Sequence, residues 1–322
     1  MQKVRKAVIT AAGRGTRQYP ASTTVQKEMF PLVDRDGITK PAIQIIAEEA
    51  LDSGIEEICI VTAPGNEEQY RRHFRGIAED LLPSFSKHRW ALEQSERLER
   101  IHQSLTYVEQ PSPEGYGHAV YCAREFVGDE PFLLLLGDHV YISGDGARCA
   151  AQVLEVYERY GCSVSAVKQT PETLLHLYGT LTGARLGDKP PTYKITELVE
   201  KPSLELAYEE LRTEGVPIGK FLCFFGMHVF TPTLFECLQY HLDNNLRQRG
   251  EIQLTNSQDM LRQKERYLAF EADGERYDTG VPFGLVETQI ALALNSPMRD
   301  QMLASLVTII AQSGQHLRGW ER

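Results

Sequence analysis

The sequence predicts an α/β fold in which helices flank a Rossmann-like sheet that is mixed but mainly parallel. Apolar, β-prone runs alternate with helical segments along most of the chain, which favours parallel strands joined by helices. Two of these runs, 58–62 and 132–136, are apolar almost throughout, as in strands that are buried on both faces. A glycine-rich turn follows the first run, at the edge where such sheets commonly bind ligands.

The elements of the first half follow from these patterns in order. A strand at about 6–11 precedes a helix at about 41–53, whose apolar face includes Ile45 and Ile46 and which ends before Gly54. Next we expect a strand at 58–62, a charged helical region at 67–105 broken near Pro83, a strand at 105–108, a helix at 117–126, a strand at 132–136, a helix at 146–160 and a strand at 163–168.

From Tyr178 onward the pattern changes to short β segments, which predicts a small β-rich extension. We expect strands at 180–186, 194–200, 221–230 and 267–271, and helices at 233–244, 253–264 and from 284. Residues after Pro297 predict a helical tail with an apolar face of Met302, Leu303, Leu306, Ile309 and Ile310. The predicted division is therefore a domain over 1–296, with halves at about 1–170 and 171–296, and a tail over 297–322.

Composition narrows the classes of function. The formal net charge of −10 argues against a general nucleic-acid binder, although a local cationic cluster still suits a small anion. No segment is long and apolar enough to span a membrane, and no signal peptide precedes the first strand. The six cysteines form no Cys-x-x-Cys pair and are expected to be buried free thiols. We therefore expect a cytoplasmic protein without membrane or nucleic-acid partners.

The turn after the first strand is a candidate phosphate loop. Gly13 and Gly15 allow backbone N–H groups to approach an anion closely, and Arg17 and Lys27 are near enough in sequence to neutralise it. The loop lacks the third glycine of a dinucleotide-binding fingerprint and the Gly-Lys-Ser/Thr ending of a P-loop. A solvent-exposed turn is the alternative interpretation of this segment taken alone.

Two aspartates follow predicted strands and are candidate metal ligands. Asp138 comes after the leucine-rich run at 132–136, and Asp278 comes after the run at 267–271. Mg²⁺ prefers carboxylate and phosphate oxygens, so two such aspartates suit one ion that bridges two phosphates. Each aspartate alone is equally consistent with a helix cap or a turn.

Two further segments are candidate substrate contacts. Glu200 and Lys201 lie together at a strand end, where a carboxylate can accept from sugar hydroxyls and an ammonium can bind a sugar phosphate. An exposed ion pair is the alternative. Gln110 and Gly115 belong to a loop that enters a helix, and the glutamine amide can pair with the imide edge of a pyrimidine. A plain connecting loop is the alternative there.

Together these segments resemble the sugar-1-phosphate nucleotidyltransferase family over about residues 6–294, most closely its uridylyltransferase branch. The resemblance rests on several motifs in the same order, namely Ala11-Ala12-Gly13-Arg14-Gly15-Thr16-Arg17, Lys27-Glu28-Met29, His73-Phe74, Gly115-x-Gly117-His118-Ala119-Val120, Glu200-Lys201-Pro202 and Gly250-Glu251-Ile252-Gln253-Leu254-Thr255. It implies the fold of nucleotide-diphospho-sugar transferases. It also implies synthesis of UDP-glucose and pyrophosphate from UTP and glucose-1-phosphate with Mg²⁺.

Residue roles carry over from the family to the matching positions only. The resemblance implies that the half at 1–170 binds the nucleotide and the half at 171–296 binds the sugar. It assigns the nucleotide to Ala12, Gly13, Gly15, Thr16, Gln110 and Gly115, the phosphates to the catalytic Arg17, Lys27 and Lys201, the sugar to Glu28, Gly179 and Glu200, and Mg²⁺ to Asp138 and Asp278. We also expect a homo-oligomer in which the tail packs on another subunit.

The chain departs from the family pattern at three places. Gly137 stands where the family usually has proline, Thr279 stands where it usually has cysteine, and residues 34–39 look inserted. These changes leave the expected reaction type intact. They keep open another nucleotide such as dTTP, another sugar-1-phosphate, or a non-catalytic regulatory protein that binds sugar nucleotides.

Overall fold

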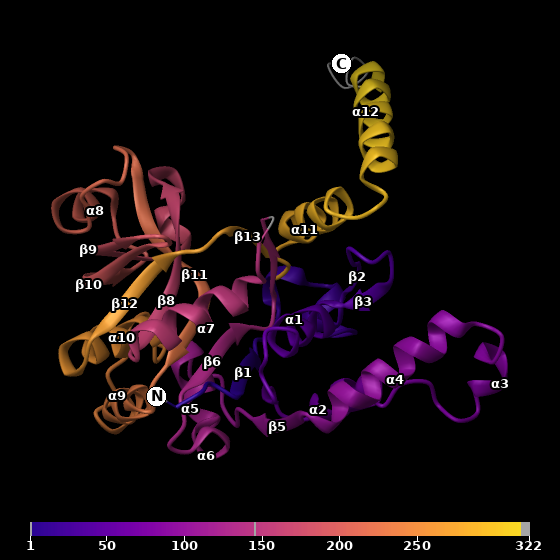
Figure 1. The fold of residues 1–322 in the computed structure, drawn as a ribbon, viewed down its shortest axis with the longest axis horizontal. Helices are drawn as coiled ribbons and strands as arrows, with labels where there is room; N and C mark the ends of the chain where they lie inside the picture. The colour runs from indigo at the N-terminus through magenta and orange to yellow at the C-terminus, as the bar shows by residue number, and fades with distance from the viewer. Residues whose placement is uncertain (1, 145, 317–322) are drawn as a thin grey trace.

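A nine-stranded mixed sheet runs through the centre of the molecule (Figure 1). The computed structural model describes residues 2–144 and 146–316. The strand order is β5-β4-β1-β6-β11-β8-β12-β10-β9. The strands are β1 (Lys6–Ala11), β4 (Glu57–Thr62), β5 (Leu105–Glu109), β6 (Phe132–Leu136), β8 (Ser163–Pro171), β9 (Gly179–Asp188), β10 (Pro191–Glu200), β11 (Lys220–Phe230) and β12 (Tyr267–Glu271).

Parallel pairing is concentrated in the first half of the sheet. Strands β5, β4, β1 and β6 are all parallel neighbours, and β12 is parallel to β8. Strand β11 joins these two groups by pairing antiparallel with both β6 and β8. Strand β10 is antiparallel to β12 and to β9. The sheet is therefore mixed as predicted, with its antiparallel part in the β-rich extension.

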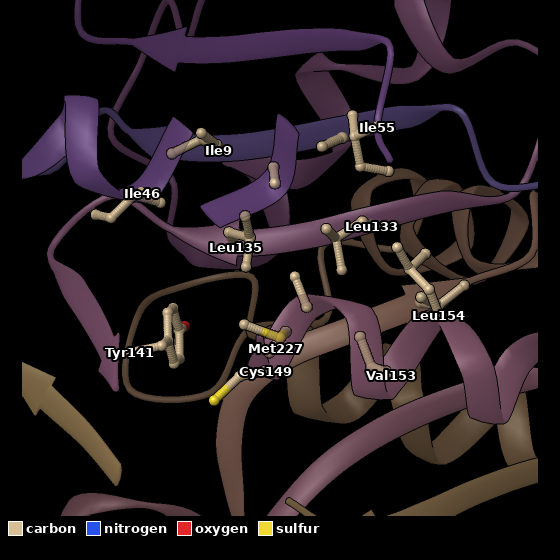
Figure 2. Packing of buried hydrophobic residues seen from close by; sticks show 14 of the residues in the cluster. Ile9, Ile46, Ile55, Leu133, Leu135, Tyr141, Cys149, Val153, Leu154 and Met227 are labelled. Carbon is tan, nitrogen blue, oxygen red and sulfur yellow. The ribbon is translucent and has the colours of Figure 1, made fainter. Parts of the chain in front are cut away.

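The apolar runs of β1 and β6 are explained by cores on both faces of the sheet. On one face, Ile9 and Leu133 pack with Ile46 and Met227, as Figure 2 shows. On the other face, the neighbouring residues of the same strands belong to a second cluster, which includes Val8, Leu134, Val120, Phe235 and Leu238. Because successive side chains of a strand point to opposite faces, a strand with two cores must be apolar at every position.

The helices surround this sheet and account for most of the predicted ones. They are α1 (Ala42–Leu51), α2 (Glu67–Phe74), α3 (Leu82–Phe85), α4 (Arg89–Gln103), α5 (Tyr116–Cys122), α6 (Arg124–Val127), α7 (Cys149–Tyr160), α8 (Leu204–Glu210), α9 (Thr233–Asp243), α10 (Leu254–Lys264), α11 (Pro282–Leu294) and α12 (Arg299–His316). Short 3₁₀ turns are η1 (Thr16–Gln18), η2 (Ala21–Thr23), η3 (Lys27–Met29) and η4 (Glu172–Leu177).

Several elements differ from the predicted ones. The charged region at 67–105 forms three helices, and Pro83 lies in the first turn of α3 rather than at a break, because proline is tolerated there. The predicted helix at 117–126 divides into α5 and α6 at Ala123. Helix α8 and the short strands β2 (Pro31–Val33), β3 (Thr39–Pro41), β7 (His139–Ser143) and β13 (Gly274–Asp278) were not predicted.

The segment that looked inserted at 34–39 is the turn of the β2–β3 hairpin. It carries carboxylates that hold the buried side chain of Lys40, whose Nζ lies 2.8 Å from Asp34 and 2.7 Å from Asp36. Glu48 of α1 lies 3.0 Å from the same nitrogen. The hairpin is therefore fastened to α1 by ion pairs around one buried ammonium group.

The tail forms α12, which leads away from the body of the protein beyond α11 (Figure 1). Val307, Ile309 and Ile310 are 65%, 59% and 69% exposed, so this chain leaves much of the tail's apolar surface uncovered. Residues 317–322 of the predicted tail lie outside the described residues. Within the described ranges, no helix has the length and apolar character that crossing a membrane requires.

Candidate active site

The β7–β13 ladder brings together the two aspartates that the sequence predicts as metal ligands. Asp278 is the direct cross-strand partner of His139, which follows Asp138. The backbone N–H of Thr279 donates to the carbonyl of Asp138 at 2.8 Å, and the Thr279 hydroxyl donates to it at 2.9 Å. Ligand atoms of Asp138, His139 and Asp278 consequently lie within 4.8 Å of one another.

Gly280 keeps the space between the two carboxylates open. A Cβ atom at this position would lie 2.6 Å from Asp138 Oδ2 and 2.9 Å from Asp278 Oδ1. The backbone N–H of Gly280 also donates to Asp278 Oδ1 at 2.7 Å. Two fixed carboxylates around a gap that a side chain would fill form a cradle that fits a divalent cation.

Two cationic side chains adjoin this cradle. The Lys27 ammonium donates to Asp138 Oδ2 and lies 3.7 Å from Glu28 Oε1, while Arg17 Nη1 lies 3.9 Å from Asp278 Oδ2. Burial lowers the pKa of Lys27, but the carboxylates of Asp138 and Glu28 outweigh burial and raise that pKa above its usual value. Burial likewise raises the pKa of Asp138, but His139 and Lys27 hold it well below its usual range. Lys27 and Asp138 are therefore both charged at neutral pH.

Glu28 lies beneath Lys27 and not on the surface of the site. Its side chain is only 1% exposed, and burial raises its pKa to about 8 against the opposing effect of Lys27. The Tyr70 hydroxyl donates to Glu28 Oε2 at 3.4 Å. This placement keeps Glu28 from contacting a sugar directly and makes it a support for Lys27.

A cavity of about 380 Å³ gathers most of the residues expected to bind the nucleotide. Ala12, Gly13, Gln110 and Gly115 line it, together with Lys27 and Asp138 at its inner end. Gly15 and Thr16 do not line this cavity. Gly15 instead adopts a left-handed φ of 62° and precedes η1, which carries Arg17.

A second cavity of about 690 Å³ holds the residues expected to contact the sugar and its phosphate. Gly179, Glu200 and Lys201 line it, and Arg17 and Asp278 reach it as well. The Thr255 hydroxyl donates to Glu200 Oε2 at 2.7 Å, and Lys201 Nζ lies 3.3 Å from Glu200 Oε1. The predicted sugar-side residues are therefore grouped as a set, with Glu28 as the exception.

The two cavities meet at shared walls. Tyr116 and Leu136 line both of them. His139 and Arg276, which the sequence did not indicate, also line the second cavity, where the Arg276 guanidinium lies 4.2 Å from the centre of the Tyr178 ring. Both missed residues lie in β7 and β13, the strands whose pairing positions them.

The loop of the first cavity is held against the motif at 250–255. The Gly117 N–H donates to the Ile252 carbonyl at 2.9 Å, and the Ile252 N–H donates to the Glu114 carbonyl at 2.8 Å. Gly115 has a φ of 114°, and a Cβ there would lie 2.7 Å from Glu251 Cβ. The structure therefore requires glycine at this point of the cavity wall.

Substitution Gly115→Ala is expected to lower the free energy of unfolding by about 2–4 kcal/mol, because backbone strain and a steric clash add together. Gly65 is a matched control, since its φ is 79° but a Cβ added there would have nothing within 4 Å. Gly65→Ala should cost about 1–2 kcal/mol from strain alone. Urea denaturation measures both, and equal losses would show that the Glu251 contact does not constrain the loop.

Comparison with known proteins identifies the class to which this fold and these paired cavities belong. The model of the family described as nucleotidyl transferase matches residues 6–294. The chain belongs to the nucleotidyl transferase family, as the order of its motifs predicted.

Individual relatives narrow the comparison. The chain is 36% identical over 310 residues to UTP–glucose-1-phosphate uridylyltransferase of Bacillus subtilis (strain 168), covering 94% of this chain and 96% of that protein. It is 35% identical to the enzyme of the same name from Staphylococcus epidermidis, covering 95% and 98%.

Solved structures agree. A UDP-glucose pyrophosphorylase complexed with UDP-glucose superposes with a TM-score of 0.71 at 29% identity, covering 89% of this chain and 98% of that one. A UTP-bound UGPase from Acinetobacter baumannii gives 0.76 at 27% identity, covering 95% and 99%. The predicted resemblance to the uridylyltransferase branch is confirmed.

Proposed function

We propose that this protein transfers a uridylyl group from UTP to glucose-1-phosphate, which yields UDP-glucose and pyrophosphate. The observation that carries the proposal is the junction of the two cavities. Lys27 and Asp138 line the first, while Arg17, Lys201 and Asp278 line the second. Two separate anionic substrates can therefore meet where cations are concentrated, and the names of the full-length relatives support the choice of UTP and glucose-1-phosphate.

The chemical step is an in-line displacement at phosphorus. A phosphate oxygen of the sugar phosphate forms a bond to the α-phosphorus of UTP, and the bond from that phosphorus to the pyrophosphate oxygen breaks. The second pKa of a phosphate monoester is about 6, so the nucleophile is already an anion at neutral pH and needs no general base. The barrier then depends on bringing two polyanions together, which makes positioning and charge neutralisation the main tasks of the site.

Three side chains would perform that neutralisation. Lys27 and Arg17 would hold the triphosphate, and Lys201 would hold the phosphate of the sugar. Glu28 would keep the Lys27 ammonium in place from below. Asp138 and Asp278 would hold Mg²⁺ in the cradle beside Gly280, where the ion would supply further positive charge to the phosphate oxygens.

Recognition of the two substrates would be divided between the cavities. The backbone of Ala12 and Gly13 would contact the nucleotide, and Gln110 with Gly115 would contact uracil. Glu200 and Gly179 would contact the sugar. Gly15 and Thr16 would act indirectly, by forming the turn that presents Arg17.

The experiment that tests this proposal is pyrophosphate release by the purified protein with Mg²⁺. UTP, dTTP, CTP, ATP and GTP are each assayed against a panel of sugar-1-phosphates. We expect release with UTP and glucose-1-phosphate. Release with a different pair would replace the proposed substrates, and no release from folded protein would favour a non-catalytic protein that binds sugar nucleotides.

We also propose that the enzyme is a homo-oligomer in which α12 packs against a second copy of the chain. The exposed apolar side chains of Val307, Ile309 and Ile310 support this packing, because an isolated helix of this length is marginal in water. Light scattering of the Ile309→Asp, Ile310→Asp double variant should give a lower native mass than the unaltered chain. An unchanged mass would contradict a role for this surface. The two halves at about 1–170 and 171–296 and the cytoplasmic location stay predictions.

A further inference from the structure

His139 lies on the same face of the β7–β13 ladder as Asp278, because directly opposed residues of an antiparallel pair project their side chains to one side. Its Nδ1 lies 2.8 Å from Asp138 Oδ1. The imidazole is partly buried and lines the second cavity beside both aspartates. A nitrogen ligand is therefore available at the cradle that two carboxylates form.

We propose that the His139 imidazole is a third protein ligand of this cradle, so that the site binds Mn²⁺ or Co²⁺ in preference to Mg²⁺. This inference rests on the metal site included in the proposed function. It adds a ligand of a different chemical kind to the two carboxylates, and with it a different selectivity.

The hydrogen bonds of Asp138 show where a cation would enter. Lys27 occupies Oδ2, and His139 occupies Oδ1. An ion beside Oδ1 would replace the proton in the contact between the carboxylate and the imidazole. The ring would then keep its proton on Nε2 and offer the Nδ1 lone pair to the ion. Displacing this contact leaves the ion pair between Lys27 and Asp138 intact.

Ligand chemistry gives the direction of the selectivity. Mg²⁺ favours oxygen ligands and gains little from an imidazole, whereas Mn²⁺ and Co²⁺ accept nitrogen and follow an increasing order of affinity. A neutral imidazole also adds no negative charge to a site that already contains Lys27 and Arg17. The alternative is that His139 serves only as a hydrogen-bond donor that orients Asp138, and the two roles predict different metal binding.

The test is direct binding of MnCl₂ or MgCl₂ to the full chain by calorimetry, without nucleotide or sugar. We expect Mn²⁺ to bind at least about tenfold more tightly than Mg²⁺. His139→Gln should weaken Mn²⁺ binding about tenfold or more and change Mg²⁺ binding less than about threefold. His88→Gln, at an exposed residue before α4, is the matched control and should change neither.

Electron spin-echo spectroscopy of bound Mn²⁺ gives a readout that does not depend on a variant folding. Coupling to an imidazole nitrogen is expected in the unaltered chain, and its absence would overturn the inference. An equal Mn²⁺ to Mg²⁺ ratio in the unaltered chain and in His139→Gln would also overturn it. Nitrogen coupling in a protein without transferase activity would contradict the proposed function alone, whereas an active enzyme without nitrogen coupling would contradict only this inference.

Discussion

Substitution Lys27→Ala is expected to lower turnover about 10³-fold, the upper end for removing one charge-stabilising donor from an active site. The Lys27 ammonium contacts Asp138 and lies 3.7 Å from Glu28, at the inner end of the nucleotide cavity. A cation held in this position needs no rearrangement when negative charge develops on the phosphates. Removing it leaves those phosphates facing two carboxylates without compensation.

The fold should survive this change, because Asp138 keeps its contact with His139 and burial raises the pKa of Glu28, which favours its neutral form. Steady-state pyrophosphate release and circular dichroism measure activity and folding separately. Lys3→Ala is the matched control, since Lys3 forms an exposed ion pair with Glu56 and lines neither cavity. Near-normal turnover of Lys27→Ala would remove the lysine from the mechanism.

Substitution Asp138→Asn should abolish Mg²⁺-dependent activity while preserving the shape of the side chain. The backbone carbonyl of Asp138 keeps its two hydrogen bonds from Thr279, so β7 and β13 stay connected. The amide that replaces the carboxylate is a weaker ligand for a hard cation and no longer forms an ion pair with Lys27. Both effects act on the same step, so we expect a loss of about 10³-fold or more.

Titration with MgCl₂ distinguishes a metal ligand from a general structural role. If Asp138 holds the ion, raising the metal concentration should not restore the activity of Asp138→Asn to the level of the unaltered chain. Asp188→Asn, at an exposed position on β9, should behave normally. Retained activity in Asp138→Asn would exclude Asp138 from the metal site.

The sequence alone predicted the elements whose environment is recorded locally. Strand β6 is apolar at every position because cores lie on both of its faces, and its predicted bounds match the structure. The helix that became α1 shows its buried face in the spacing of Ile45, Ile46 and Ala50. The paired aspartates were likewise indicated by position, since each lies beside a strand that the sequence marks clearly.

The rest depends on partners that are distant in sequence. Strands β7 and β13 pair only with each other, and β13 carries Glu275 and Arg276 where a buried strand would have apolar residues. No local pattern therefore indicated that His139 would face Asp278. Glu28 illustrates a different limit, because a charged residue is expected at the surface and only the tertiary structure shows it buried beneath Lys27.

The junction of the two cavities has a consequence for how such enzymes diversify. Among the described residues that line the cavities, only Tyr116 and Leu136 are common to both. Substitutions around Gly179 and Glu200 therefore change the surroundings of the acceptor without altering the wall that receives the donor. Descendants of one ancestral enzyme can acquire a new acceptor specificity in this way while inheriting the donor specificity unchanged.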